Sequence, residues 1–165
     1  MQAVSSRVLS AAILPVLTLL SSPVRADIEE ARDLMEAGRF AEARAMFETY
    51  ARSGNADAEE LIGVMYALGL GVEADPERAF EWYLRSSLKG HPGAQSGLAY
   101  YYEFGIGLPA PDLVRAYLWY SLSKIGGDVD APLSLEYLSP RLSREEKARA
   151  QVLIDDYRAW MYPFR

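Results

Sequence analysis

Apolar residues along this chain recur three and four positions apart, which is the spacing of amphipathic helices. Phe40, Ala43 and Phe47 follow this spacing and would share one face of a helix. The same pattern predicts helices over residues 28–37, 40–52, 56–68, 76–89, 94–104, 113–124, 131–138 and 144–160. No segment alternates apolar and polar residues with the period of a strand. We therefore predict an all-α fold.

Helix ends are marked by residues suited to them. The glycines within residues 69–71 would end the third predicted helix, because glycine adopts the left-handed conformation without steric cost. Asp75 would cap the next helix, with Pro76 in its first turn. Ser143 and Glu146 form the pattern of a capping box, which predicts the start of the last helix.

A thirteen-residue block occurs twice, at residues 63–75 and 99–111, 36 residues apart. The period lengthens to 37 after one inserted residue in the second glycine-rich loop. Other positions follow the same spacing: Ala43, Ala79 and Ala116; Phe47, Tyr83 and Tyr120; Gly54, Gly90 and Gly127; Ala58, Ala94 and Ala131. A fixed period in the thirties is typical of stacked helical pairs.

The block also carries a pattern of LG-x-x-Y, G-x-GV, D-x-x-x-A and W-Y elements. Its residues are Ala58, Ile62, Gly63, Tyr66, Gly69, Gly71, Val72, Asp75, Ala79, Trp82, Tyr83 and Gly90, then Leu98, Tyr102, Gly105, Gly107, Ala116, Trp119, Tyr120 and Gly127. This resembles the Sel1-like repeat, a relative of the tetratricopeptide repeat. The second copy departs at Ala99 and in the longer loop 108–112, which leaves the shape of that loop open. The resemblance implies an α-solenoid of antiparallel helical pairs that serves as a scaffold for protein–protein contacts, with no catalytic residues.

The repeat pattern and the N-terminal residues together predict a division of the chain into five parts. Residues 1–26 would be a signal peptide, 27–55 a tetratricopeptide-like capping pair, 56–92 and 93–128 two repeats, and 129–165 a degenerate repeat with a capping helix. Leu153, Tyr157 and Trp160 share one face of that last helix. We expect this face to cover the open end of the stack.

The N-terminal residues have the pattern of an export signal. Arg7 precedes a thirteen-residue apolar stretch, 8–20, and small residues lie at Val24 and Ala26 where a signal peptidase would cleave after Ala26. The apolar stretch is shorter than the roughly 20 residues that a membrane-spanning helix needs. We expect a periplasmic or secreted protein with no membrane insertion after the signal is removed.

The net charge and the cysteine content limit the classes of partner and of chemistry that this protein can have. The net charge is −6, and loss of Arg7 and Arg25 with the signal would make it −8. No basic cluster follows, so nucleic acid and anionic membranes are disfavoured as partners. A protein with a basic or apolar segment is favoured. The absence of cysteine excludes disulfides and thiol chemistry.

Residues that could carry chemistry have structural explanations. The glycine-rich loops follow predicted helices, whereas a phosphate-binding loop follows a strand. The single histidine, His91, lies in a Gly-Pro turn without the further ligands that zinc requires, and we expect it to be a solvated turn residue. Adjacent glutamates occur near helix starts, where negative charge is favourable. We expect no catalysis, cofactor or metal.

The aromatic residues supply the candidate binding site. Trp82, Tyr83, Trp119 and Tyr120 recur with the repeat, which favours core packing. Three adjacent tyrosines, residues 100–102, span most of a helix circumference, so at least one would reach the surface. The first helices of such pairs line a concave groove, where aromatic side chains anchor peptides. The candidate partner-binding residues are Glu59, Glu60, Met65, Tyr100, Tyr101 and Glu103.

Three alternatives to this site and function stay open. The candidate aromatic residues could be buried in the core instead. The tyrosines could stack on cell-wall glycan or a small ligand. An enzyme is disfavoured, since cysteine-rich relatives of this repeat described as β-lactamase-like carry features that this chain lacks, and it has no Ser-x-x-Lys motif.

Overall fold

The structure, a computed structural model, describes residues 23–161, with side chains from residue 27 onward. In this range the chain is all-helical, which confirms the predicted fold class. The elements are α1 (Pro23–Glu36), α2 (Phe40–Arg52), α3 (Ala56–Leu68), α4 (Pro76–Ser87), α5 (Pro92–Phe104), α6 (Leu113–Gly126), α7 (Ala131–Leu138), the 3-10 turn η1 (Ser139–Arg141) and α8 (Arg144–Met161). Helices α2, α3 and α7 have the predicted bounds.

The predicted signal peptide lies outside the described residues, except that residues 23–26 form the first turn of α1. Cleavage after Ala26 therefore stays a prediction. Among the helices that are described, none is both long enough and apolar enough to cross a membrane.

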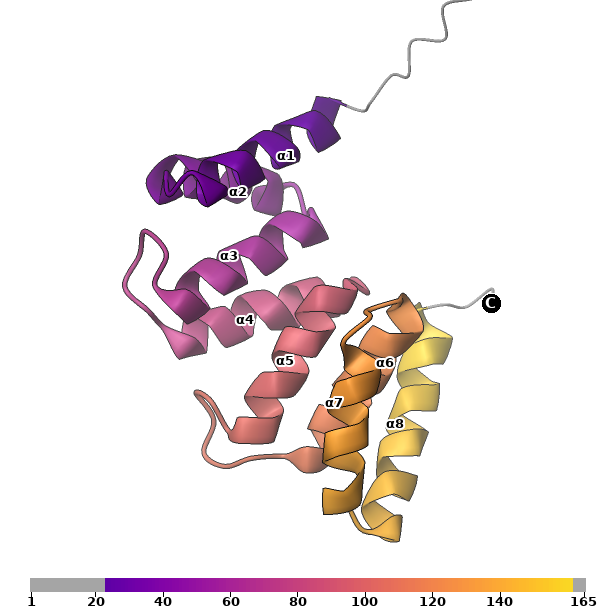
Figure 1. Cartoon of the computed structure of the whole chain (residues 1–165). Helices are drawn as coiled ribbons and strands as arrows, with labels where there is room; N and C mark the ends of the chain where they lie inside the picture. Colours follow the sequence, from indigo (N-terminus) through magenta and orange to yellow (C-terminus); the bar gives the residue numbers. More distant parts are fainter. Residues whose placement is uncertain (1–22, 162–165) are drawn as a thin grey trace, which may run out of the picture.

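The helices form antiparallel pairs that follow one another along the molecule, from α1 and α2 at one end to α7 and α8 at the other (Figure 1). Each pair contacts the next, and α6 packs against both α7 and α8. The end of the stack is covered only in part as predicted. Leu153 and Tyr157 pack on the core, but Trp160 is 61% exposed, so its expected role in covering the end is wrong.

Two apolar clusters make up the core. The first lies among α1 to α3, and Phe47, Ile62 and Met65 are its largest fully buried members. The second joins α4 to α8, with Trp119 and Tyr120 among its buried side chains. Tyr66 packs against both clusters, so the stack has a continuous interior. Of the recurring aromatic residues, Tyr83, Trp119 and Tyr120 are buried as predicted, and Trp82 packs partly buried against the first cluster.

The ring of Tyr83 explains one glycine of the repeat pattern. This ring, from α4, lies between α3 and α5. A Cβ atom added at Gly63 would meet it at 2.9 Å, and one added at Gly97 would meet it at 3.2 Å. Any larger side chain would push the ring out of its place, because packed interiors leave little free volume. The two glycines therefore let α3 and α5 approach around Tyr83.

The two glycine-rich loops have the same backbone conformation at their glycines despite the insertion. Gly69 and Gly105 end α3 and α5 with φ near +70°, and Gly71 and Gly107 follow with φ of +68° and +67°. The longer second loop therefore preserves the helix ends. Asp112 then caps α6 by accepting a hydrogen bond from the backbone N–H of Arg115 at 2.9 Å, as Asp75 does for α4.

A buried ion pair joins α3 to α4. The Glu59 carboxylate is fully buried and lies 2.9 Å from Arg85 Nη2 and 2.6 Å from Lys89 Nζ. Lys89 also donates a hydrogen bond to the backbone carbonyl of Gly54 at 3.0 Å. Two cations thus neutralise a carboxylate that would otherwise be costly to bury.

Candidate functional site: the first-helix face

Four of the six predicted partner-binding residues belong to the interior. Glu59 and Met65 are fully buried, and Tyr101 and Glu103 are 6% and 9% exposed. The prediction that these side chains line an open groove is therefore wrong. Met65 lies in the first core cluster, and Tyr101 packs edge to face against Tyr83 with ring centroids 5.5 Å apart.

The Glu103 carboxylate already has partners within the chain. Its carboxylate pairs with Arg141 and accepts a hydrogen bond from the Tyr120 hydroxyl at 3.2 Å. Burial and the nearby Glu103 charge both raise the pKa of Tyr120. This contact ties α5 to α6 and to the turn after α7.

The remaining two predicted residues belong to one surface, where Tyr100 is exposed and Glu60 is only partly so. We call this surface the first-helix face. It consists of residues of α3, α5 and α7 that lie outside the two core clusters, together with one residue of η1: Asp57, Glu60, Leu68, Gly93, Ser96, Gly97, Tyr100, Phe104, Leu133, Ser134, Tyr137 and Arg141. Helices α3 and α5 contact each other, and the Glu103–Arg141 pair links α5 to η1.

Exposed large apolar side chains gather on this face. Those on the three first helices are Leu68 (67% exposed), Tyr100 (49%), Phe104 (53%), Leu133 (54%) and Tyr137 (72%). The rings of Tyr100 and Phe104 lie against each other with centroids 4.6 Å apart. Exposed apolar groups that recur on neighbouring elements are typical of interaction surfaces.

Sequence reasoning missed Leu68, Phe104, Leu133 and Tyr137, although the repeat spacing contains the signal for most of them. Phe104 follows Leu68 by 36 residues, and Tyr137 follows Tyr100 by 37. Equivalent positions in a repeat point to the same side of the stack. Tracing outward positions, instead of consensus positions, along the repeat would have found this row.

The other end of the face, near the start of α3 and α5, is acidic. Glu60 is largely buried there, and this burial raises the pKa of its carboxyl group to about 7, despite the opposing effect of Arg32 on α1. Asp57 lies one turn earlier and is exposed. Burial also raises the pKa of Tyr83, and the Glu60 charge acts in the same direction.

His91 is a helix cap and not the solvated turn residue that we predicted. Its Nδ1 accepts a hydrogen bond from the backbone N–H of Ala94 at 3.1 Å, and its Nε2 lies 3.1 Å from Asp57 Oδ1. Asn55 and Asp128, at equivalent positions, accept in the same way from Ala58 and Ala131. The single histidine therefore has a structural role at the start of α5.

This geometry predicts acid sensitivity at His91. Burial lowers the pKa of its imidazole, so the fold favours the neutral form, whose unprotonated Nδ1 accepts the capping bond. Its contribution to stability is complete above pH 6.5 and is lost as the pH falls below that value. We expect His91→Asn to match the wild type at pH 7.5, whereas His91→Ala loses about 1 kcal/mol.

Chemical denaturation at pH 7.5 and 5.5 measures this effect. The wild type should lose more stability between these two values than His91→Asn does. Glu60 changes the stability in the opposite direction, because its raised pKa stabilises the fold as the pH falls. Both proteins retain Glu60, so its effect cancels in the comparison. Equal losses in the two proteins would exclude the capping role of the neutral imidazole.

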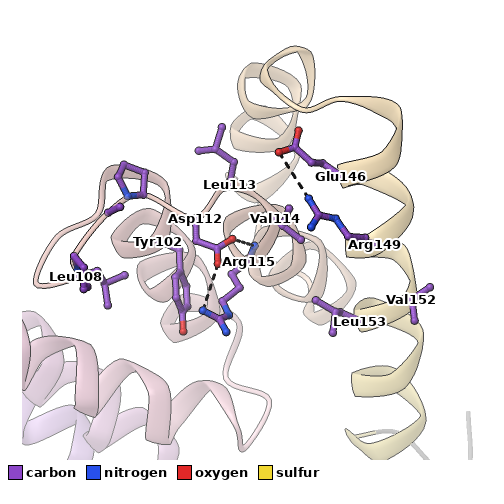
Figure 2. A pocket seen from close by; sticks show the side chains of 13 residues that line it. Tyr102, Leu108, Asp112, Leu113, Val114, Arg115, Glu146, Arg149, Val152 and Leu153 are labelled. Carbon is purple, nitrogen blue, oxygen red and sulfur yellow. Dashed lines mark hydrogen bonds and ion pairs between the residues drawn. The ribbon is translucent and has the colours of Figure 1, made fainter.

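A groove of about 920 Å³ lies away from this face, between the loop 108–112, the start of α6 and α8. Figure 2 shows that its charged groups are paired with one another: Arg115 with Asp112 and Arg149 with Glu146. Arg115 also lies over the Tyr102 ring, 5.6 Å from its centroid. The first repeat has an equivalent hollow of about 760 Å³, where Arg78 lies over Tyr66. The groove therefore follows from repeat geometry.

The paired helices, the 36-residue period and the recurring glycine loops define an α-helical repeat protein. The Sel1 repeat model matches residues 56–91 and 92–128, which covers α3 to α6. A Sel1 repeat protein from Oxalobacter formigenes is 35% identical, with a TM-score of 0.60, over 68% of this chain and 87% of that one. The chain belongs to the Sel1 repeat family, whose members are typically non-catalytic and generally mediate protein–protein interactions.

A second solved structure supports the fold. It is a protective antigen of uropathogenic Escherichia coli strains that displays an SLR fold, and it matches with a TM-score of 0.79 at 20% identity. The match covers 85% of this chain but 31% of the antigen, so the chain spans about a third of that relative's length. No curated protein gives a significant match.

Proposed function

We propose that this protein is a non-catalytic scaffold of the bacterial cell envelope that holds a segment of another protein on its first-helix face. The observation that carries the proposal is the row of exposed apolar side chains from α3, α5 and α7. Exposed apolar side chains at equivalent positions do not stabilise a helical surface in water. At an interface, aromatic and aliphatic groups of this kind anchor the partner segment.

The charges of the face agree with a partner that is itself a protein segment. Acidic groups lie at one end and apolar groups at the other, so a segment with basic and apolar residues fits both. The face carries no cluster of three metal-ligating residues among those described. The proposed location rests on the export signal predicted within residues 1–26.

A pull-down from envelope extract tests this function. The wild type is compared with Tyr100→Ala/Phe104→Ala, which removes the stacked ring pair of the face, and with Val152→Ala/Trp160→Ala, which removes two equally exposed apolar groups from α8. We expect a protein that is recovered by the wild type and by the α8 variant but is lost from the face variant. Hot-spot aromatic residues contribute 2 kcal/mol or more each, so the loss should exceed about thirtyfold.

Two other results would contradict the proposal. Equal recovery by both variants would place the binding surface elsewhere. Retention of the purified wild type on bare peptidoglycan, abolished by Tyr100→Ala/Phe104→Ala, would instead support stacking of the aromatic rings on glycan.

A further inference from the structure

The acidic end of the first-helix face holds a carboxylate that the fold does not neutralise. In the described chain, Glu59 has two cations and Glu103 has Arg141, whereas no cation lies within ion-pairing distance of Glu60. The charge of Arg32 on α1 acts on Glu60 without such a pair. The chain thus provides a counter-ion for Glu59 and Glu103 but none in direct contact with Glu60.

A glycine of α5 lies opposite Glu60. A Cβ atom added at Gly93, in the first turn of α5, would lie 3.8 Å from Glu60 Oε1 and 3.2 Å from the His91 ring. The Tyr83 ring lies beneath, under Gly97. Gly93 and Gly97 therefore place no side chain on α5 between Glu60 and Tyr100.

The second repeat pairs its own buried acid, which lies at a different repeat position, within the chain. Its equivalent of Glu60 is Ser96, and its buried acid is Glu103, which Arg141 of η1 neutralises. In the first repeat, α5 is the next first helix after Glu60, and no ion pair joins the two among the described residues. Glu60 is therefore left to a cation from outside the chain.

We propose that Glu60 binds a lysine or arginine side chain of the partner segment, while Leu68, Tyr100 and Phe104 bind a large apolar residue of the same segment. This inference rests on the proposed function and adds the chemistry of the partner. Along a helix axis, Glu60 and Leu68 are about 12 Å apart, at 1.5 Å per residue. An extended segment covers that distance in three or four residues. The basic residue and the apolar residue are therefore separated by about that number.

The titration of Glu60 is consistent with this role. Burial raises the pKa of the Glu60 carboxyl group to about 7, so the site is half neutral in the free protein at neutral pH. A bound cation would favour the charged form and lower this pKa. Besides Arg32, the groups whose charges interact with Glu60 are Asp57 and Tyr83, and neither is positively charged. The His91 imidazole lies beside Gly93, opposite Glu60, and burial lowers its pKa.

Selection from a random twelve-residue peptide library displayed on phage tests the inference. The immobilised wild type is compared with Glu60→Gln and with Glu81→Gln, which removes one charge from the exposed surface of α4. We expect the wild type and Glu81→Gln to enrich peptides with lysine or arginine three or four residues from a large apolar residue. Glu60→Gln should keep the apolar preference and lose the basic one.

A synthetic peptide from the selection then gives the size of the effect. Replacing its basic residue by norleucine should weaken binding to the wild type about tenfold and leave binding to Glu60→Gln unchanged, since charge-assisted hydrogen bonds contribute about that much. An equal loss on both proteins overturns the role of Glu60. Circular dichroism checks that Glu60→Gln is folded.

The outcomes separate the two proposals. If the wild type enriches apolar peptides without a basic preference, the role of Glu60 is wrong and the scaffold function stands. If the wild type enriches no peptide, or if Tyr100→Ala/Phe104→Ala enriches the same peptides as the wild type, the first-helix face is not the site and both proposals fail.

Discussion

Replacing Gly105 by alanine should lower the free energy of unfolding by about 3 to 4 kcal/mol. Two effects add. Gly105 has φ of +68°, a left-handed conformation that costs other residues about 1 to 2 kcal/mol. In addition, the new Cβ atom would lie 2.8 Å from the Pro111 backbone nitrogen and 3.0 Å from the Ala110 carbonyl carbon, and overpacking of this kind costs about 1 to 3 kcal/mol.

Gly38→Ala is the matched control, measured in the same chemical denaturation experiment. Gly38 has a similar φ of +74°, but nothing lies within 4 Å of a Cβ atom added there. It should therefore show the conformational cost alone, about 1 kcal/mol. Equal losses of unfolding free energy in the two variants would mean that the loop 108–112 moves to make room for the new Cβ atom. Its close packing on the end of α5 would then add no cost.

Removing both cations from Glu59 should have the second largest effect. Arg85→Ala/Lys89→Ala leaves a fully buried carboxylate without a counter-ion. Loss of a buried partner costs about 3 to 5 kcal/mol, and the half-exposed positions of these two cations favour a lower value of about 2 to 3 kcal/mol. Urea unfolding at pH 7 measures the loss.

A third substitution distinguishes an unpaired charge from lost packing. Adding Glu59→Leu to Arg85→Ala/Lys89→Ala removes the unpaired carboxylate and should recover most of the stability. Arg44→Ala, which breaks the more exposed pair with Glu48 on α2, should cost less than about 1 kcal/mol. If the triple variant stays as unstable as the double variant, the cations stabilise the fold by contacts other than the one with Glu59.

Most of the fold could be predicted because its signals are local. The Asp75 cap, the Ser143–Glu146 capping box and the glycines after α3 act within a few residues of themselves, and the cap and glycine stop recur in the second repeat. All of these form the predicted contacts or conformations. The repeat spacing then extends each local interpretation from one pair to the next.

The candidate site depended on contacts that are distant in sequence, and there prediction failed. Glu59 and Glu60 are adjacent and equally acidic, yet only Glu59 meets cations, 26 and 30 residues further along the chain. The sequence likewise predicts that one tyrosine of residues 100–102 reaches the surface, but not which one. Tyr101 is buried because Tyr83 fills the space beside it, and Tyr100 is left outside.

The burial pattern also changes what the face can do. With Met65 and Tyr101 inside, the apolar part of the surface moves to the later turns of α3 and α5, at Leu68 and Phe104. The acidic part stays at the earlier turns, at Asp57 and Glu60. This separation gives the face a direction, so a partner segment would bind in one orientation.

Site-specific photocrosslinking in living cells tests most directly whether the first-helix face is where a protein partner binds. A photoreactive phenylalanine analogue is placed at Phe104 on the face and, separately, at Glu81 on the opposite helix of the preceding pair. The account predicts a discrete crosslinked protein at position 104 and none at position 81. The same crosslinked protein at position 81 and its absence at position 104 would contradict it.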